Sequence, residues 1–202
     1  MIHPSTELRF IDPQMGYGVF ATELIPKGTI IYVEDELDLR ISETEYRNHQ
    51  PMIKSVLDKY TYINQNGLRI MCWDFGKYMN HSCSSSTIVT VYGFEIATRD
   101  IQIGEELTTE YGILNIESNL ECSCGSPDCR GTIRNSDLPM LHGRWDRIIL
   151  DALSSLKNVA QPLMSLIDEK TMQDVEKCIE DPTHYLSILN MYYPYQESVL
   201  EE

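Results

Sequence analysis

Residues 78–83 read YMNHSC, and residues 104–112 read GEELTTEYG. Asn80 and His81 stand next to each other in the first segment. An asparagine side chain donates and accepts hydrogen bonds, and the histidine adds a further donor or acceptor, so the pair can hold a polar zwitterion. The side chains of Asn80 and His81 could instead form hydrogen bonds with buried backbone groups. Likewise, Tyr111 in the second segment could be a structural residue at the end of a strand.

Two further segments lie on either side of these motifs. Residues 16–21 read GYGVFA, where the glycines let the backbone turn or approach a ligand closely. Residues 122–131 read CSCGSPDCRG, and clustered thiols in a chain without an export signal hold metal more often than they form disulfides. Three local thiolates leave one position of a zinc tetrahedron for a distant residue. Free or oxidised thiols are the alternative, while the isolated Cys72 and Cys178 are expected to be small buried apolar residues.

In this order, the four segments resemble the SET-domain protein lysine methyltransferases that carry a zinc-binding post-SET segment. The resemblance covers roughly residues 8–134. It implies an α+β protein with a mainly β SET fold of small sheets and a pseudoknot, a helical insert at about residues 42–62 and a C-terminal helical extension. We expect the SET domain in residues 1–117, the post-SET zinc segment in 118–134 and the extension in 135–202.

The resemblance also implies the residues of a cofactor site and a catalytic site. Tyr111 would be the catalytic residue, whose hydroxyl orients the lysine amine. That amine, with an ordinary pKa of about 10.4, must first lose its proton, and a narrow aromatic channel next to a sulfonium charge lowers its pKa. The residues expected to bind S-adenosylmethionine are Gly16, Tyr17, Gly18, Asn80, His81 and Tyr111.

Cys83, directly after the Asn-His pair, is the position that the resemblance assigns as the fourth ligand of one structural zinc ion. The complete predicted set is Cys83, Cys122, Cys124 and Cys129. Four thiolates would close the coordination sphere, so this zinc would activate no water.

Some positions depart from the family pattern. Thr109 stands where many members carry an aromatic residue that is associated with the number of methyl groups added, so mono-, di- or trimethylation stays open. Lys77 replaces a common arginine and keeps the charge without the bidentate donation. We interpret Glu105 and Glu106, which could look like an acid and base pair, as solvated or fold-bracing residues.

The composition indicates an ordinary globular chain with an acidic surface. Of 202 residues, 42% are apolar and 23% charged, and 31 acidic against 16 basic side chains give a net charge of −15. This charge disfavours direct binding to nucleic acid or to anionic membranes and favours a lysine-rich protein such as a histone, a histone-like protein or a ribosomal protein. Without a signal peptide or a membrane-spanning stretch, we expect an intracellular protein, cytoplasmic or, in a eukaryote, nuclear.

Two other classes of function compete with the enzyme. One is a non-catalytic SET-scaffold module that binds a basic peptide. The other is a zinc-held adaptor whose helical tail binds the partner. The oligomeric state and the substrate lysine cannot be read from the residues.

Local patterns predict the helices. Ser42 and Glu45 form a capping box, Pro51 starts a second helix, and residues 145–156 follow one helix stripe. Residues 171–174 resemble another helix cap. For the C-terminal tyrosines we favour core packing over a peptide groove; they are Tyr185, Tyr192, Tyr193 and Tyr195.

Overall fold

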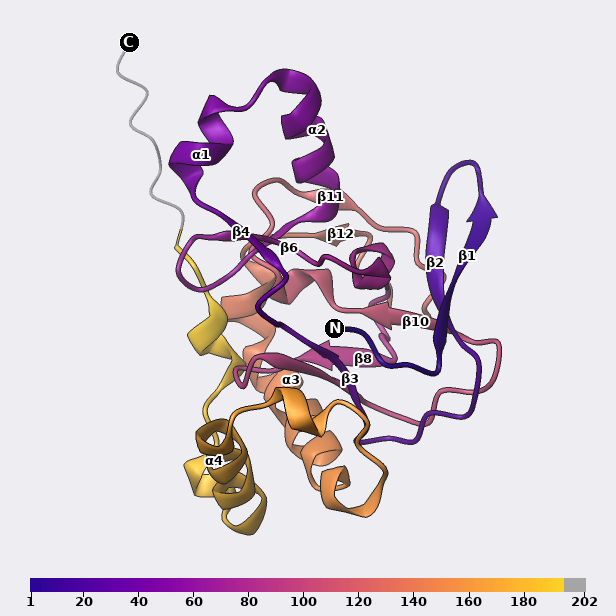
Figure 1. The fold of residues 1–202 in the computed structure, drawn as a ribbon, viewed down its shortest axis with the longest axis vertical. Helices are drawn as coiled ribbons and strands as arrows, with labels where there is room; N and C mark the ends of the chain where they lie inside the picture. Colours follow the sequence, from indigo (N-terminus) through magenta and orange to yellow (C-terminus); the bar gives the residue numbers. More distant parts are fainter. Residues whose placement is uncertain (195–202) are drawn as a thin grey trace.

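Four small β-sheets make up the centre of the molecule in the computed structural model, which describes residues 1–194 (Figure 1). Tyr195, the last of the four C-terminal tyrosines, lies outside the described residues. The first sheet has the order β1-β2-β10-β7. Its strands are β1 (Thr6–Asp12), β2 (Gly16–Ala21), β10 (Glu106–Thr109) and β7 (Asn80–His81).

The other three sheets are two- or three-stranded and antiparallel. One has the order β3-β9-β8, formed by Ile30–Val33, Phe94–Ala97 and Thr87–Val89. A second has the order β4-β6-β5, formed by Leu39–Ile41, Arg69–Met71 and Tyr62–Ile63. The third pairs β11 (Leu120–Glu121) with β12 (Thr132–Ile133). This α+β arrangement of small sheets agrees with the expected fold class.

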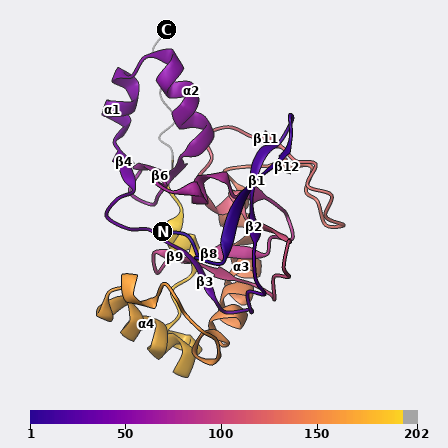
Figure 2. The ribbon, with the colours of Figure 1, turned by 45° about the vertical axis from the view of Figure 1, so that its right-hand side comes forward.

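Two helices, α1 (Glu43–Asn48) and α2 (Pro51–Tyr60), form the insert and stand at one end of the molecule in both views (Figures 1 and 2). The capping box at Ser42 is confirmed, because its side chain accepts from the Glu45 amide while the Glu45 carboxylate accepts from the Ser42 amide. Pro51 begins α2, as predicted. Since α1 buries no residue and α2 buries only Leu57, the insert packs loosely on the sheets.

The C-terminal extension contains α3 (Asp137–Leu153) and α4 (Glu169–Glu180). The predicted cap at residues 171–174 is wrong by one turn, because Asp168 is the N-cap and accepts a hydrogen bond from the Thr171 amide. The rest of the extension to residue 194 contains short 3-10 turns, where the sequence pattern suggested longer helices; they are Leu156–Asn158, Met164–Leu166, Pro182–His184 and Ile188–Met191.

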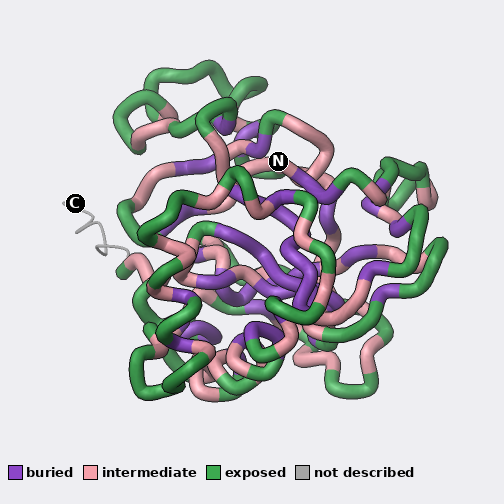
Figure 3. The backbone as a smooth tube through the Cα atoms, turned by 60° about the horizontal axis from the view of Figure 1, so that its bottom comes forward, coloured by how far each residue is buried: buried purple, intermediate pink, exposed green. Residues whose placement is uncertain are grey.

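Two hydrophobic clusters hold these layers together, and Figure 3 shows the buried chain concentrated in the central strands. The predicted stripe of α3 is confirmed: Trp145, Ile149 and Leu153 are buried against β3, β8 and β9 in the larger cluster. The smaller cluster packs β2 and β10 against the segment before β7 and includes Val19, Leu107 and Met79. None of the helices within residues 1–194 has the length and apolar character needed to cross a bilayer.

Candidate active site

The three predicted cofactor segments lie side by side in one sheet. β7 pairs in parallel with β10, so that Asn80 lies opposite Thr108 and His81 opposite Thr109. On its other edge, β10 pairs with β2. Because these pairings join residues about 30 and 90 positions apart in the chain, only the folded sheet brings the segments together.

Gly18 lies where two polar side chains converge on the backbone of β2. Asn80 Nδ2 donates to the carbonyl of Tyr17 at 3.1 Å and to Glu106 Oε1 at 2.7 Å. A Cβ atom on Gly18 would lie 2.5 Å from Glu106 Oε1 and 3.2 Å from Asn80 Nδ2. This close approach requires glycine, and it gives Glu106 a bracing role beside Asn80, which agrees with its interpretation from the sequence.

Tyr111 begins a 3-10 turn, Tyr111–Ile113, directly after β10. Its hydroxyl donates to the carbonyl of Met79 at 2.8 Å, and its backbone amide donates to Nδ1 of His81 at 3.1 Å. Burial, together with the charges of Glu95 and Glu106, raises the pKa of Tyr111 to about 12. The phenol is therefore protonated at neutral pH and serves as a hydrogen-bond donor and acceptor.

A cavity of about 690 Å³ opens beside Tyr111. Its wall comes from the strands around the Tyr111–Ile113 turn, the end of α2 and the C-terminal extension, which contributes Met191. Its volume falls within the range of ligand sites, roughly 300 to 1,000 Å³. Side chains that line it together with Tyr111 include Tyr32, Tyr62, Phe94, Glu95 and Thr109.

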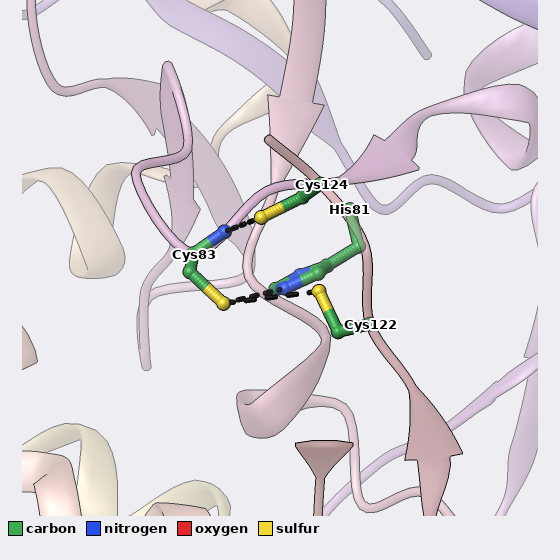
Figure 4. Close-up of side chains that lie close together, drawn as sticks. All are labelled: His81, Cys83, Cys122 and Cys124. Carbon is green, nitrogen blue, oxygen red and sulfur yellow. Dashed lines mark hydrogen bonds between the residues drawn. The ribbon is translucent and has the colours of Figure 1, made fainter. Parts of the chain in front are cut away.

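Three of the predicted cysteine ligands, Cys83, Cys122 and Cys124, lie close together with His81 (Figure 4). The fourth, Cys129, lies close to Cys122. The Sγ atom of Cys122 is 3.9 Å from that of Cys83 and 3.7 Å from that of Cys129. Thiolates of one tetrahedral zinc site stand about 3.8 Å apart, given Zn–S bonds of about 2.3 Å. The two Sγ–Sγ distances therefore fit a metal site. The backbone amide of Cys83 also donates to Cys124 Sγ at 3.4 Å, which places Cys124 next to Cys83.

His81 adds a fifth candidate ligand to this cluster. Its Nε2 atom lies 3.4 Å from Cys83 Sγ, and the ligand atoms of His81, Cys83, Cys122 and Cys124 all lie within 4.8 Å of one another. The four residues whose ligand atoms all lie this close together are therefore His81, Cys83, Cys122 and Cys124, whereas the predicted set has Cys129, which lies close to Cys122, in place of His81. The sequence did not indicate His81 as a metal ligand, because His81 and Cys122 are far apart along the chain and only the fold brings them together.

An ionic network, which the sequence patterns did not indicate, links the cysteine-rich segment to the Tyr111–Ile113 turn. Arg130 is held by Glu110, and its Nε atom lies 3.3 Å from Asp137 Oδ2 without hydrogen-bond alignment. Glu110 Oε1 also accepts from the Gly112 amide at 2.8 Å. The only signal in the sequence was that Arg130 follows the last clustered cysteine and Glu110 precedes Tyr111.

Comparison with known proteins identifies the class to which this fold and site belong. The sequence profile of the SET domain matches residues 16–112, which include the three predicted cofactor segments and Tyr111. The chain therefore belongs to the SET-domain family.

Several curated relatives are histone-lysine methyltransferases. A histone-lysine N-methyltransferase, H3 lysine-36 specific, of Mycosarcoma maydis is 30% identical over 72% of this chain and 16% of its own length. A histone-lysine N-methyltransferase, H3 lysine-4 specific, of Schizosaccharomyces pombe is 28% identical over 56% of this chain and 14% of its own length. A variant-silencing SET domain-containing protein of Plasmodium falciparum is 36% identical over 56% of this chain and 5% of its own length. The chain thus spans less than a fifth of each of these relatives.

Proposed function

We propose that this chain transfers a methyl group from S-adenosylmethionine to the side-chain amine of a lysine in a basic protein. The observation that carries the proposal is the joining of residues 16–18, 80–81 and 106–109 in one sheet, which continues into the turn of Tyr111 beside a cavity that Tyr111 lines. The match of this region to the SET domain supports it. SET-domain relatives with histone-lysine methyltransferase activity support it further.

The cofactor is proposed to be held by five residues, which are Gly16, Tyr17, Gly18, Asn80 and His81. The absence of a side chain at Gly18 keeps the backbone accessible to the amide of Asn80 and to Glu106. Such a cluster of amide, carbonyl and imidazole groups fits the polar amino acid end of the cofactor. When bound, S-adenosylmethionine supplies an electrophilic methyl group.

Tyr111 is proposed to orient the lysine amine in the cavity. Its protonated hydroxyl can accept a hydrogen bond from an N–H group of the lysine while it donates to the carbonyl of Met79. Burial among aromatic side chains disfavours a charged amine and so lowers its pKa. Catalysis by this chain would then consist mainly of positioning the neutral amine.

One structural zinc ion is proposed to be bound by four cysteines, which are Cys83, Cys122, Cys124 and Cys129. The ion would fix the segment after β10 to the turn after β7, close to His81. This closed site would contribute stability and no chemistry to methyl transfer.

The substrate is proposed to be a lysine-rich protein, because the net charge of −15 attracts a cationic partner. A histone is the first candidate, since relatives carry names that specify histone H3. The place of action, cytoplasm or nucleus, would follow that substrate.

A labelled-cofactor assay tests the proposal. Purified chain would be incubated with isotope-labelled S-adenosylmethionine and core histones or ribosomal proteins, and methylated lysines located by mass spectrometry. We expect label on lysine side chains. Cofactor binding in a calorimeter without transfer to any lysine would contradict catalysis and favour a peptide-binding module on the SET scaffold.

A further inference from the structure

A buried carboxyl group lines the cavity beside Tyr111. Glu95 in β9 is buried and lines the cavity, and its Oε1 atom accepts a hydrogen bond from Thr87 Oγ1 at 2.6 Å. Burial raises the pKa of Glu95, while the hydroxyls of Thr109 and Thr87 oppose that rise. The Glu95 charge in turn contributes to the raised pKa of Tyr111, so the two groups interact electrostatically.

Two other carboxylates in the cavity wall form ion pairs with arginine side chains, unlike Glu95. Glu34 is paired with Arg40 at 2.7 Å, and Glu117 with Arg69. Glu95 has no cation within 4.0 Å among residues 1–194. A buried carboxylate without a cation is costly, which makes this site receptive to a positively charged ligand.

Thr109 provides a second observation that points to a ligand. This residue is only 5% exposed and lines the same cavity. Its Oγ1 atom lies near enough to Glu95 to lower the pKa of that carboxyl, yet it makes no hydrogen bond of ordinary length within the described part of the chain. A buried hydroxyl left without a partner is unfavourable, and a ligand in the cavity could provide that partner.

We propose that Glu95 binds the ammonium group of the lysine as it enters the cavity, before the amine loses the proton that methyl transfer requires it to lose, with the Thr109 hydroxyl as a second acceptor. An ammonium group has three N–H donors and no acceptor, which matches a carboxylate and a hydroxyl on one wall. The approach of a cation favours the ionised form of Glu95. The identification of the ligand as a protein lysine rests on the proposed function. Glu95 would then be a positioning residue that lies outside the three predicted cofactor segments.

Competitive binding of two small probes tests the inference without methyl transfer. Ligand-observed NMR would compare Nα-acetyl-lysine N-methylamide with Nα-acetyl-norleucine N-methylamide, which lacks the amine. We expect the wild-type chain to prefer the lysine probe. Glu95→Gln keeps an acceptor for Thr87 but removes the charge, and it should weaken lysine binding by roughly tenfold or more while norleucine binding stays unchanged.

Two further variants sharpen the test. Thr109→Val should weaken lysine binding by a smaller factor, because the carboxylate remains. Glu105→Gln is the matched control: Glu105 lies outside the cavity, where it pairs with Arg99 and accepts from the Gln102 amide, and its loss should leave the preference unchanged. Thermal unfolding of each variant would establish that it is folded.

The outcomes separate this inference from the proposed function. An equal affinity of the wild-type chain for both probes overturns the inference, even if Glu95→Gln does not fold. A folded Glu95→Gln variant that keeps the lysine preference also overturns it, whether or not proteins are methylated. A preference that depends on Glu95, in a chain that methylates no lysine, would support ammonium binding by Glu95 and contradict the proposed methyl transfer.

Discussion

Arg130 holds the carboxylate of Glu110 with both terminal nitrogens, Nη1 to Oε2 at 2.8 Å and Nη2 to Oε1 at 2.6 Å. Arg130 directly follows Cys129, and Glu110 directly precedes Tyr111. This bidentate pair therefore ties the cysteine-rich segment to the Tyr111–Ile113 turn. The geometry matches the fork of a guanidinium to the two oxygens of a carboxylate, which an ammonium group cannot reproduce.

Removing one partner of this pair should destabilise the fold. Glu110 is 2% exposed, so Arg130→Met would leave a buried carboxylate without its cation and cost about 3–5 kcal/mol in the free energy of unfolding. Urea denaturation measures this. Arg47→Met, which breaks an exposed pair with Glu43 in α1, is the control and should cost no more than about 0.5 kcal/mol. Similar losses in the two variants would show that the Arg130–Glu110 pair has no special structural importance.

Loss of the Tyr111 hydroxyl should remove most of the proposed activity. Tyr111→Phe keeps the ring but cannot position the amine, and we expect methyl transfer to fall by roughly 100-fold or more. Initial rates with labelled cofactor measure this. Tyr92→Phe serves as the control, because Tyr92 does not line the cavity and should leave the rate unchanged. Full activity of Tyr111→Phe would rule out the orienting role.

Elemental analysis should find about one zinc ion per chain. Cys124→Ser and Cys129→Ser should each lower the zinc content, since a four-thiolate site needs every ligand. Cys178→Ser, in the core of the extension, should keep the zinc. His81→Ala separates the two possible sets of ligands: retention of zinc supports the four cysteines, and loss with retention by Cys129→Ser supports His81 as the ligand.

Two glycines should respond in opposite directions to an added methyl group. Gly18→Ala places Cβ 2.5 Å from Glu106 and 2.8 Å from Ile11, so we expect a loss of about 1–3 kcal/mol in stability and weaker cofactor binding. Gly143 in α3 has no atom within 4 Å of an added Cβ, so Gly143→Ala should stabilise by about 0.5–1 kcal/mol. Denaturation and cofactor calorimetry check both, and an equally stable, cofactor-binding Gly18→Ala variant would contradict this account.

Stability should fall in alkaline solution between pH 10 and about 12. Burial raises the pKa of Tyr111 to about 12, whereas an unfolded tyrosine ionises near pH 10. The unfolded state therefore loses its proton first, and stability that is fully present below pH 10 is lost as the pH rises through the folded pKa. For Tyr111 alone this amounts to about 3 kcal/mol.

The alkaline effect should be smaller in Tyr111→Phe, which has no phenol at this position. Urea denaturation at pH 9 and pH 11 provides the measurement. Equal loss in the wild-type chain and the variant would mean that other tyrosines account for it; burial also raises the pKa of Tyr32 and Tyr62.

Local features of the fold could be predicted because neighbouring residues encode them. The Ser42 capping box, the start of α2 at Pro51 and the apolar stripe of α3 each depend on residues within one or a few helical turns. The cap of α4 was misplaced because threonine and aspartate both cap helices, and the choice of Asp168 over Thr171 depends on packing that places Val175 and Cys178 in the core.

Contiguous patterns of residue type are enough to identify the SET-domain motifs and the residues that belong to them. Which of these residues contact one another depends on the folded chain. The parallel pairing of β7 with β10 places His81 beside Tyr111, and the fold brings Glu95, Thr109 and Met191 to one cavity and Arg130 to Glu110. Such contacts join residues that are separated by many positions in the chain. The packing of the buried sheets sets the distances between these residues, and no local sequence pattern specifies that packing.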